Sequence, residues 1–125
     1  MTENDITFII RGAIFRVYNV LGPGLLESAY EAALAYEIRL VGLDVKTQVA
    51  LSLIYDGIRL DVGYRIDMLV EDKIIIEIKS TENLAAVHHK QVITYLRLSG
   101  KKLGLLVNFN CAEISKSIFR KVNGL

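Results

Sequence analysis

Residues 74–79 have the sequence IIIEIK, in which one glutamate, Glu77, interrupts an otherwise apolar run. A short run that is rich in isoleucine predicts a β-strand. Acidic side chains are rarely buried unless they are paired, because removing a charge from water is costly. The chain therefore has to fold so that this strand lies in a sheet and its carboxyl group has a partner.

The spacing of apolar residues predicts the elements around this strand. Residues 6–21 are apolar at three- and four-residue steps, which predicts a helix with Asp5 as its N-cap that ends at Gly22-Pro23-Gly24. Asp56-Gly57 predicts a two-residue hairpin turn. The predicted elements are helices at 6–21 and 26–41, strands at 45–55, 58–70 and 74–79, a helix at 81–99, a strand at 103–109 and a short closing helix at 115–122.

We expect these elements to form a single domain over residues 1–125 with an α/β fold, in which helices cover one mixed (α+β) sheet. The three consecutive strands form an antiparallel meander. The helix at 81–99 then joins the third strand to a fourth, parallel strand.

Composition narrows the class of protein. Of the 125 residues 52% are hydrophobic, which excludes a disordered chain, and the formal net charge of +1 weighs against nonspecific coating of DNA. The single cysteine, Cys111, favours a reducing compartment, and we expect a buried or edge thiol there rather than a nucleophile. The N-terminal MTENDITFII carries acids where a signal peptide carries basic residues, and no apolar stretch approaches the roughly 20 residues of a membrane span. We therefore expect a cytoplasmic protein.

The turn after residue 70 decides whether Glu77 has an acidic partner. If Glu71-Asp72-Lys73 is the turn, Val70 faces Ile74 and Asp67 faces Glu77, with Cβ atoms about 5 Å apart. Two carboxylates at that distance repel each other unless a cation lies between them, and hard divalent ions bind such oxygen ligands. With a two-residue turn, the two acids would lie on opposite faces of the sheet.

Two basic residues are expected on the same face, Lys79 after Glu77 and Arg65 before Asp67. The carboxylates would then hold Mg²⁺ or Mn²⁺, a Lewis acid for a phosphate oxygen, and Lys79 would serve the attacking water or stabilise charge on phosphorus. The pattern equally fits a surface ladder of ion pairs in which Glu77 meets Arg65 and Lys79. The pattern alone leaves both interpretations open.

Further polar residues occupy the predicted helices. Glu27, in the first turn of the second helix, is either a favourable acid at a helix N-terminus or a third carboxylate of the site, and Tyr30 shares its face. His88, Gln91 and Tyr95 form one stripe, which is either a solvated face or a set of contacts to a phosphate or a base. His89 is expected to be exposed. Late basic residues, which are scattered surface charges or phosphate contacts, are Lys101, Lys102, Lys116, Arg120 and Lys121.

Three segments together resemble the GxxExxY family: GPGLLESAY, which contains Gly24-x-x-Glu27-x-x-Tyr30, then YRIDMLVEDKIIIEIKS, and HHKQVITYLRLSGKKLGLLVNF. That family is assigned to the PD-(D/E)XK nuclease superfamily. The resemblance implies a restriction-endonuclease-like core of a helix, three antiparallel strands, a helix and a strand, here with an extra N-terminal helix and a short C-terminal helix.

The resemblance also implies roles for individual residues. Asp67 matches the motif aspartate, Glu77 and Lys79 match the E-x-K tripeptide, and Glu27 matches the helical glutamate before the sheet. Gln91 and Tyr95 match the Gln-x-x-x-Tyr helix of the exonuclease branch. The sequence departs from the motif at Ile66, where a proline can precede the aspartate.

The leading hypothesis is a Mg²⁺- or Mn²⁺-dependent phosphodiester hydrolase that acts on DNA, with Asp67, Glu77 and Glu27 as metal ligands and Lys79 as a further catalytic residue. Substrate-positioning residues would be Gln91, Tyr95, His88, Arg65 and Tyr30. The alternative is a noncatalytic nucleic-acid- or protein-binding module that keeps the nuclease fold, and in either case a homodimer or a protein partner would supply specificity. An enzyme acting on free nucleotides is a weaker third hypothesis, because no Gly-rich phosphate loop is present.

Overall fold

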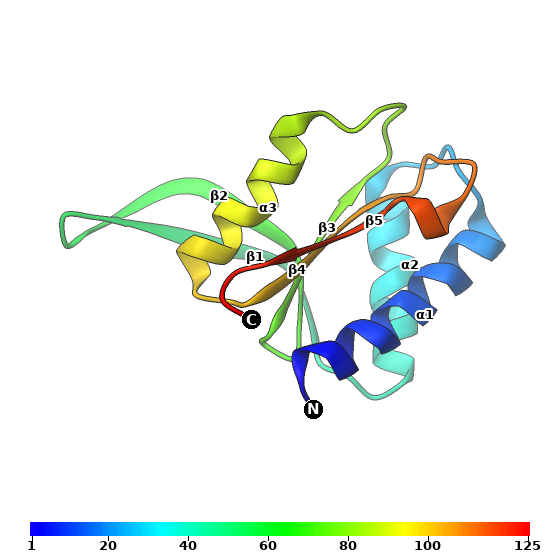
Figure 1. Ribbon diagram of the computed structural model, residues 1–125, viewed down its shortest axis with the longest axis horizontal. Coiled ribbons are helices and arrows are strands. Elements are labelled where there is room, and N and C mark those ends of the chain that lie inside the picture. Colours follow the sequence, from blue (N-terminus) through cyan, green and yellow to red (C-terminus); the bar gives the residue numbers. More distant parts are fainter.

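Five strands form one mixed sheet in the order β1-β2-β3-β4-β5 in the computed structural model, which describes residues 1–125 (Figure 1). The elements are α1 (Glu3–Leu21), α2 (Glu27–Leu40), β1 (Val45–Tyr55), β2 (Ile58–Val70), β3 (Ile74–Lys79), α3 (Ala86–Ser99), β4 (Leu103–Asn108), a 3₁₀ turn (Ile114–Lys116) and β5 (Ile118–Val122). Strands β1 to β3 are antiparallel, β4 runs parallel to β3, and β5 is antiparallel to β4. The predicted fold class, meander and parallel crossover are therefore confirmed.

Two apolar layers bury the centre of the sheet. The larger layer joins the inner faces of α1 and α2 to alternate residues of β3, namely Ile74, Ile76 and Ile78. The smaller layer lies under α3 and includes Ile75 and Leu96. Figure 1 shows α3 on one side of the sheet and α1 and α2 on the other. Because both faces of β3 are covered, its side chains from Ile74 to Ile78 are buried, and only Lys79 at its end is partly exposed.

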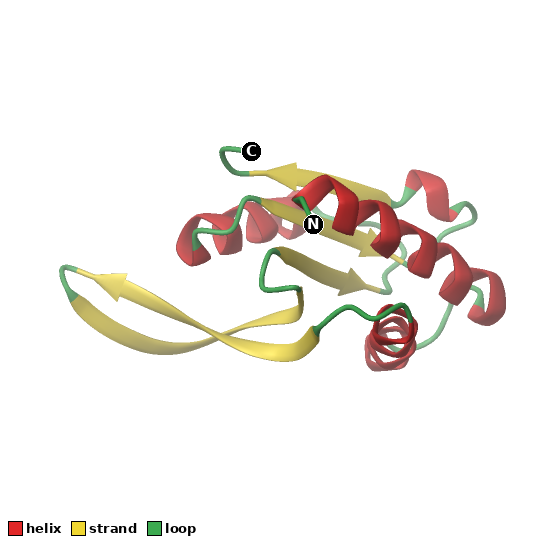
Figure 2. Cartoon of the chain, turned by 90° about the horizontal axis from the view of Figure 1, so that it is seen from below, coloured by secondary structure: helices red, strands yellow, loops and turns green.

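The hairpin of β1 and β2 extends beyond the helices that cover the rest of the sheet (Figure 2). Its two-residue turn has positive φ angles at Asp56 (50°) and Gly57 (75°), as the predicted hairpin requires. The pairing register shifts between Leu51 and Leu53, and Gly63 on the partner strand has a φ of 80°, typical of a glycine bulge. The outer half of the hairpin is solvent-exposed.

Three predictions about secondary structure were wrong, two about where a helix begins and one about the type of the last element. The N-cap of α1 is Thr2, not Asp5, which is the third helical residue and bonds back to the Thr2 backbone in a capping box. Helix α3 begins at Ala86 rather than at residue 81, because the Asn108 amide bonds both backbone groups of Thr81 and keeps that segment extended. Residues 115–122 contain a 3₁₀ turn and strand β5 instead of a closing helix.

Strand β5 forms because β4 is buried along its whole length and would otherwise present an unpaired edge. The ring of His89 packs edge-on against Phe119 of β5, with 4.9 Å between centroids. His89 is therefore half-buried, and the expectation that it is exposed was wrong. Burial, followed by the charge of Lys121, lowers the pKa of His89.

Substituting alanine for Gly104 tests the contact between β4 and α3. A Cβ atom there would lie 2.9 Å from Val92 Cγ1 and 3.4 Å from the Ile75 carbonyl oxygen, so the helix would have to shift. We expect Gly104→Ala to lower the free energy of unfolding by about 1–3 kcal/mol in urea denaturation. The matched control is Gly12→Ala, inside α1, which meets only the flexible end of Arg16 and should raise stability by about 0.5–1 kcal/mol. Equal effects of the two substitutions would contradict this account.

Candidate active site

Asp67 and Glu77 meet where the paired section of β2 and β3 ends. The ladder pairs Val70 with Ile74 and Met68 with Ile76, which confirms the three-residue turn. Beyond that point, the Asp67 amide donates to Glu77 Oε1 at 3.2 Å, and the Ile78 amide donates to Asp67 Oδ2 at 2.8 Å. Each acid thus accepts a hydrogen bond from the backbone of the opposite strand, so the two carboxyl groups are held close together.

The Glu77 carboxyl group lies in the protein interior, and its residue is only 3% exposed. Burial, and then the neighbouring Asp67 carboxylate, raise the pKa of Glu77 from 4.5 to about 9. None of the salt bridges involves Glu77, so the surface ladder of ion pairs with Arg65 and Lys79 is not formed. In the metal-free protein, Glu77 is therefore protonated at neutral pH, although the charge of Lys79 acts weakly in the opposite direction.

We expected Asp67 and Glu77 to lie on the same face of the sheet, but their carboxyl groups point to different surroundings. Ile66 packs in the layer under α3, whereas Met68, two residues later, packs in the layer of α1 and α2. The alternation of β2 is therefore interrupted at Asp67. As a result, the Asp67 carboxylate opens into a pocket beside α2, while the nearby Glu77 carboxyl group remains buried.

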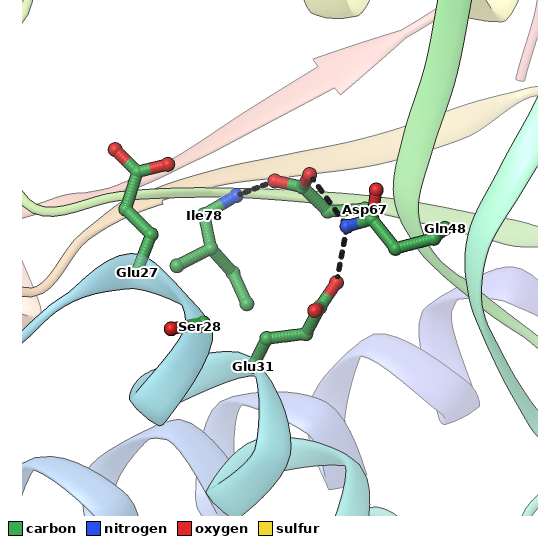
Figure 3. A pocket seen from close by; sticks show the side chains of 6 residues that line it. All are labelled: Glu27, Ser28, Glu31, Gln48, Asp67 and Ile78. Atoms are coloured by element: carbon green, nitrogen blue, oxygen red, sulfur yellow. Dashed lines mark hydrogen bonds between the residues drawn. The ribbon is translucent and has the colours of Figure 1, made fainter.

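This pocket has a volume of about 210 Å³ and is mostly polar (Figure 3). Helix α2 contributes Glu27, Ser28 and Glu31, and the sheet contributes Gln48, Asp67 and Ile78. Three carboxylates therefore line one concave surface, with no basic side chain among the lining residues. Such a surface attracts cations.

We did not predict four of these residues, Ser28, Glu31, Gln48 and Ile78. Gln48 Nε2 lies 2.8 Å from Glu31 Oε1 and 3.5 Å from Asp67 Oδ1, so its amide lies between the two acids. Burial raises the pKa of Glu31, with a smaller contribution from the charge of Asp67, and the hydrogen bond from Gln48 acts in the opposite direction. A helical spacing of four residues from Glu27 was the signal that could have identified Glu31.

Tyr30 is fully buried and does not line the pocket. Its ring stacks on Phe109 with 4.3 Å between centroids, and its hydroxyl donates to the Gly22 carbonyl and accepts from the Leu25 amide. Ser80, just after β3, donates to the carbonyl of Leu25 from the other side. These bonds fix the loop that precedes Glu27, so the Tyr30 hydroxyl supports the N-terminal end of α2.

Of the stripe on α3, Gln91 and Tyr95 lie together. Gln91 Nε2 donates to the Tyr95 hydroxyl at 3.0 Å. Burial, and then the charge of the nearby Glu77 carboxyl group, raise the pKa of Tyr95. His88 instead accepts a hydrogen bond from the Ala85 amide through Nδ1 and caps the helix. Its side chain forms no hydrogen bond with Asp67 or Glu77.

The basic residues lie around rather than in the pocket. Lys79 is half-buried, lies two residues after Glu77 and forms no salt bridge. Arg65 is exposed, and its guanidinium donates weakly to the Gln48 carbonyl at 3.4 Å. Among the late basic residues, Lys101 pairs with Asp72 and Lys116 pairs with Glu113. None of the late basic residues lines the pocket.

The carboxylate ligands at this site suit a Mg²⁺ ion that keeps several waters better than a metal ion whose ligands all come from the protein. No group of three or more His, Cys, Asp or Glu side chains is close enough to hold a metal ion. Mg²⁺ commonly binds through one or two carboxylates and keeps several waters, which the pair Asp67 and Glu77 can accommodate beside an open pocket. A cation there would also favour the ionised form of Glu77.

A model of the PD-(D/E)XK nuclease superfamily matches residues 4–121 of the chain. No match was found among curated proteins or solved structures. None of the helices combines the length and apolar character needed to cross a bilayer.

The buried acid predicts an unusual pH dependence of stability in metal-free protein. The native state keeps the Glu77 proton up to a pKa of about 9, whereas the unfolded chain loses it near 4.5, so the free energy of unfolding falls as pH rises through that window. Glu77→Gln keeps an acceptor for the Asp67 amide and removes this titration. In urea denaturation with EDTA, we expect it to match wild type near pH 4.5 and to be more stable by about 3 kcal/mol at pH 7. The exposed Glu82→Gln is the control, and a parallel pH dependence of Glu77→Gln and wild type would refute the argument.

The hydroxyl of Tyr30 can be tested separately from its ring. Tyr30→Phe keeps the stack on Phe109 but leaves two backbone groups of the loop, at Gly22 and Leu25, without their partner. We expect a loss of about 1–3 kcal/mol in the free energy of unfolding. Tyr36→Phe, on the exposed face of the same helix, should change stability by less than about 0.5 kcal/mol. Similar losses for both variants would show that the loop does not depend on this hydroxyl.

Proposed function

The chain belongs to the PD-(D/E)XK nuclease superfamily, and we propose that it is a divalent-metal-dependent phosphodiester hydrolase that acts on DNA. The observation that carries this proposal is the pair Asp67 and Glu77, two adjacent carboxyl groups of which one is buried and the other opens into an acidic pocket. Nucleases of this superfamily generally use divalent metals such as Mg²⁺. The motif Gly24-x-x-Glu27-x-x-Tyr30 supports placing the chain in the GxxExxY family within it.

Asp67 and Glu77 would hold Mg²⁺ or Mn²⁺, with the acids of α2 facing the same pocket. When bound, the ion supplies Lewis-acid chemistry for a phosphate oxygen and lowers the pKa of a coordinated water. The side chains that line the pocket bear no positive charge, so repulsion from their carboxylates opposes the approach of a phosphate to the metal-free site.

Lys79 would orient the attacking water, help to remove its proton, or stabilise charge on the phosphorus. Its ammonium group is free of salt bridges and lies near Glu77, whose pKa its charge lowers slightly against the larger opposing effects. Gln91 and Tyr95 are on α3, and Tyr95 lies near Glu77 of β3. These two side chains would position the substrate. Arg65, at the base of the hairpin, would contact a backbone phosphate.

A second candidate is a noncatalytic binding or assembly module that keeps the nuclease fold. The exposed apolar side chains near the hairpin turn favour it, because Ile54, Tyr55 and Ile58 are each at least 60% exposed. A second copy or a protein partner that covers them would supply specificity. The unpaired Cys111 supports the cytoplasm as the compartment for either function.

The test is cleavage of labelled single- and double-stranded DNA, and of the matching RNA, with Mg²⁺, Mn²⁺ or EDTA. We expect metal-dependent cleavage of DNA that falls at least about 100-fold in Asp67→Asn and in Lys79→Met. Matched controls are Asp61→Asn, an exposed acid on the same strand, and Lys46→Met, an exposed lysine on β1, and both should retain activity.

If wild type neither binds a divalent metal nor cleaves any substrate, while all variants fold normally, the hydrolase proposal fails. Binding of nucleic acid or of a partner without cleavage would then support the module. Preferential cleavage of RNA would keep the hydrolase and change its substrate.

A further inference from the structure

Gln48 has a backbone conformation that is unusual for its place in a strand. Its φ angle is +52°, and it lies inside β1 between the pairs Thr47–Met68 and Val49–Ile66, which places it opposite Asp67. The other non-glycine residues with positive φ, Asp56, Glu71 and Asp72, are in turns. A left-handed residue in mid-strand is strained, and such strain persists where the surrounding structure enforces it.

The effect of this conformation is to place an amide between two acids. Figure 3 shows the Gln48 side chain between Glu31 and Asp67. Its amide nitrogen lies 2.8 Å from Glu31 Oε1 and 3.5 Å from Asp67 Oδ1. Because a primary amide is a neutral donor of two hydrogen bonds, it can bring two carboxylates close together without neutralising either. The weak bond from Arg65 to the Gln48 carbonyl acts on the backbone of the same residue.

The two glutamates of α2 differ in their relation to Asp67. Figure 3 shows the Glu31 carboxylate directed at Gln48 and Asp67, whereas the Glu27 carboxylate lies beyond Ile78, away from Asp67. Glu31 is half-buried and Glu27 is exposed. No hydrogen bond or salt bridge holds the Glu27 carboxylate in the pocket, whereas Glu31 is tied to β1 through Gln48.

We propose that Gln48 is a positioning residue of the candidate metal site, and that it holds Glu31, rather than Glu27, as the helical carboxylate that faces Asp67 and a bound divalent cation. This inference rests on the proposed metal-dependent function. Because no three acids are close enough to bind one ion directly, Glu31 would meet the cation through a coordinated water, as an outer partner of the site. The strained backbone of β1 is retained because it aims the amide at Glu31. Replacing a group that orients a metal site through hydrogen bonds typically weakens metal affinity about 10- to 100-fold.

The experiment is a titration with Mn²⁺ alone, followed by electron paramagnetic resonance of the free ion, on the full chain without substrate. We expect Glu31→Gln and Gln48→Gly each to weaken Mn²⁺ binding about 10- to 100-fold. Glu27→Gln should weaken it less than Glu31→Gln does. Glu37→Gln, on the same helix but paired with Arg16, is the matched control that should bind as wild type does.

Glycine is chosen at position 48 because it adopts positive φ without strain. Gln48→Gly therefore removes the amide while leaving the urea midpoint of the metal-free protein equal to or above that of wild type. A residue with a merely structural role would lower that midpoint, and this result would overturn the positioning role. Gln48→Asn, which keeps an amide and tolerates a left-handed backbone, should recover part of the Mn²⁺ affinity lost in Gln48→Gly.

The failures of the two proposals are distinguishable. If Asp67→Asn abolishes Mn²⁺ binding but Glu31→Gln and Gln48→Gly bind as wild type does, the inference about Gln48 and Glu31 is wrong and the metal site stands. The same holds if Glu27→Gln has the larger effect. If wild type itself binds no Mn²⁺, the metal-dependent function fails and the inference fails with it.

Discussion

The position of Glu77 in a strand that is covered on both faces is the constraint around which the rest of the site is arranged. Its neighbours on β3 are isoleucines that fill the layers of α1, α2 and α3, so the carboxyl group cannot turn to water without disrupting the core. The Glu77 carboxyl group accepts one hydrogen bond from the Asp67 amide. The nearby Asp67 carboxylate also repels its ionised form. Proteins retain such an unfavourable arrangement where it serves a function, and the surrounding core offsets its cost.

The loops that surround the site are held by side chains from other elements. Asn108 of β4 holds Thr81, the Tyr30 hydroxyl holds the loop before α2, and Ser80 joins that loop to the end of β3. The bonds of Asn108 and Ser80 join segments that are 27 and 55 residues apart, whereas the bond from Tyr30 to Gly22 spans eight residues. The acids are therefore positioned by a frame of hydrogen bonds around the ends of β3 and α2, which limits how far their separation can change.

Much of the sheet could be predicted because its signals are local. Asp56-Gly57 specifies a hairpin, and the three-residue turn sets the register that brings Asp67 beside Glu77. Strand β5 was missed because Ile118 and Val122 are four residues apart, a spacing that fits one turn of a helix and also one face of a strand. What decided between them was the open edge of β4, which no local pattern reveals.

The site was only partly predictable for the same reason. The motif acids follow from spacing, but Gln48 enters the pocket through an unusual φ angle, and the role of Glu31 depends on a hydrogen bond to a residue 17 positions away. Tyr30 shares a helical spacing with Glu27, yet its ring faces the core. Spacing identifies a face of a helix, whereas packing determines what that face meets.

The left-handed residue in β1 has one more consequence, which concerns association between molecules. β1 is an edge strand of 11 residues whose outer backbone groups could recruit a strand from another chain. The kink at Gln48 and the bulge opposite Ser52 break this edge into short pieces that do not present a continuous, flat row of donors and acceptors. The geometry that aims an amide at the acids therefore also protects the sheet against edge-to-edge aggregation.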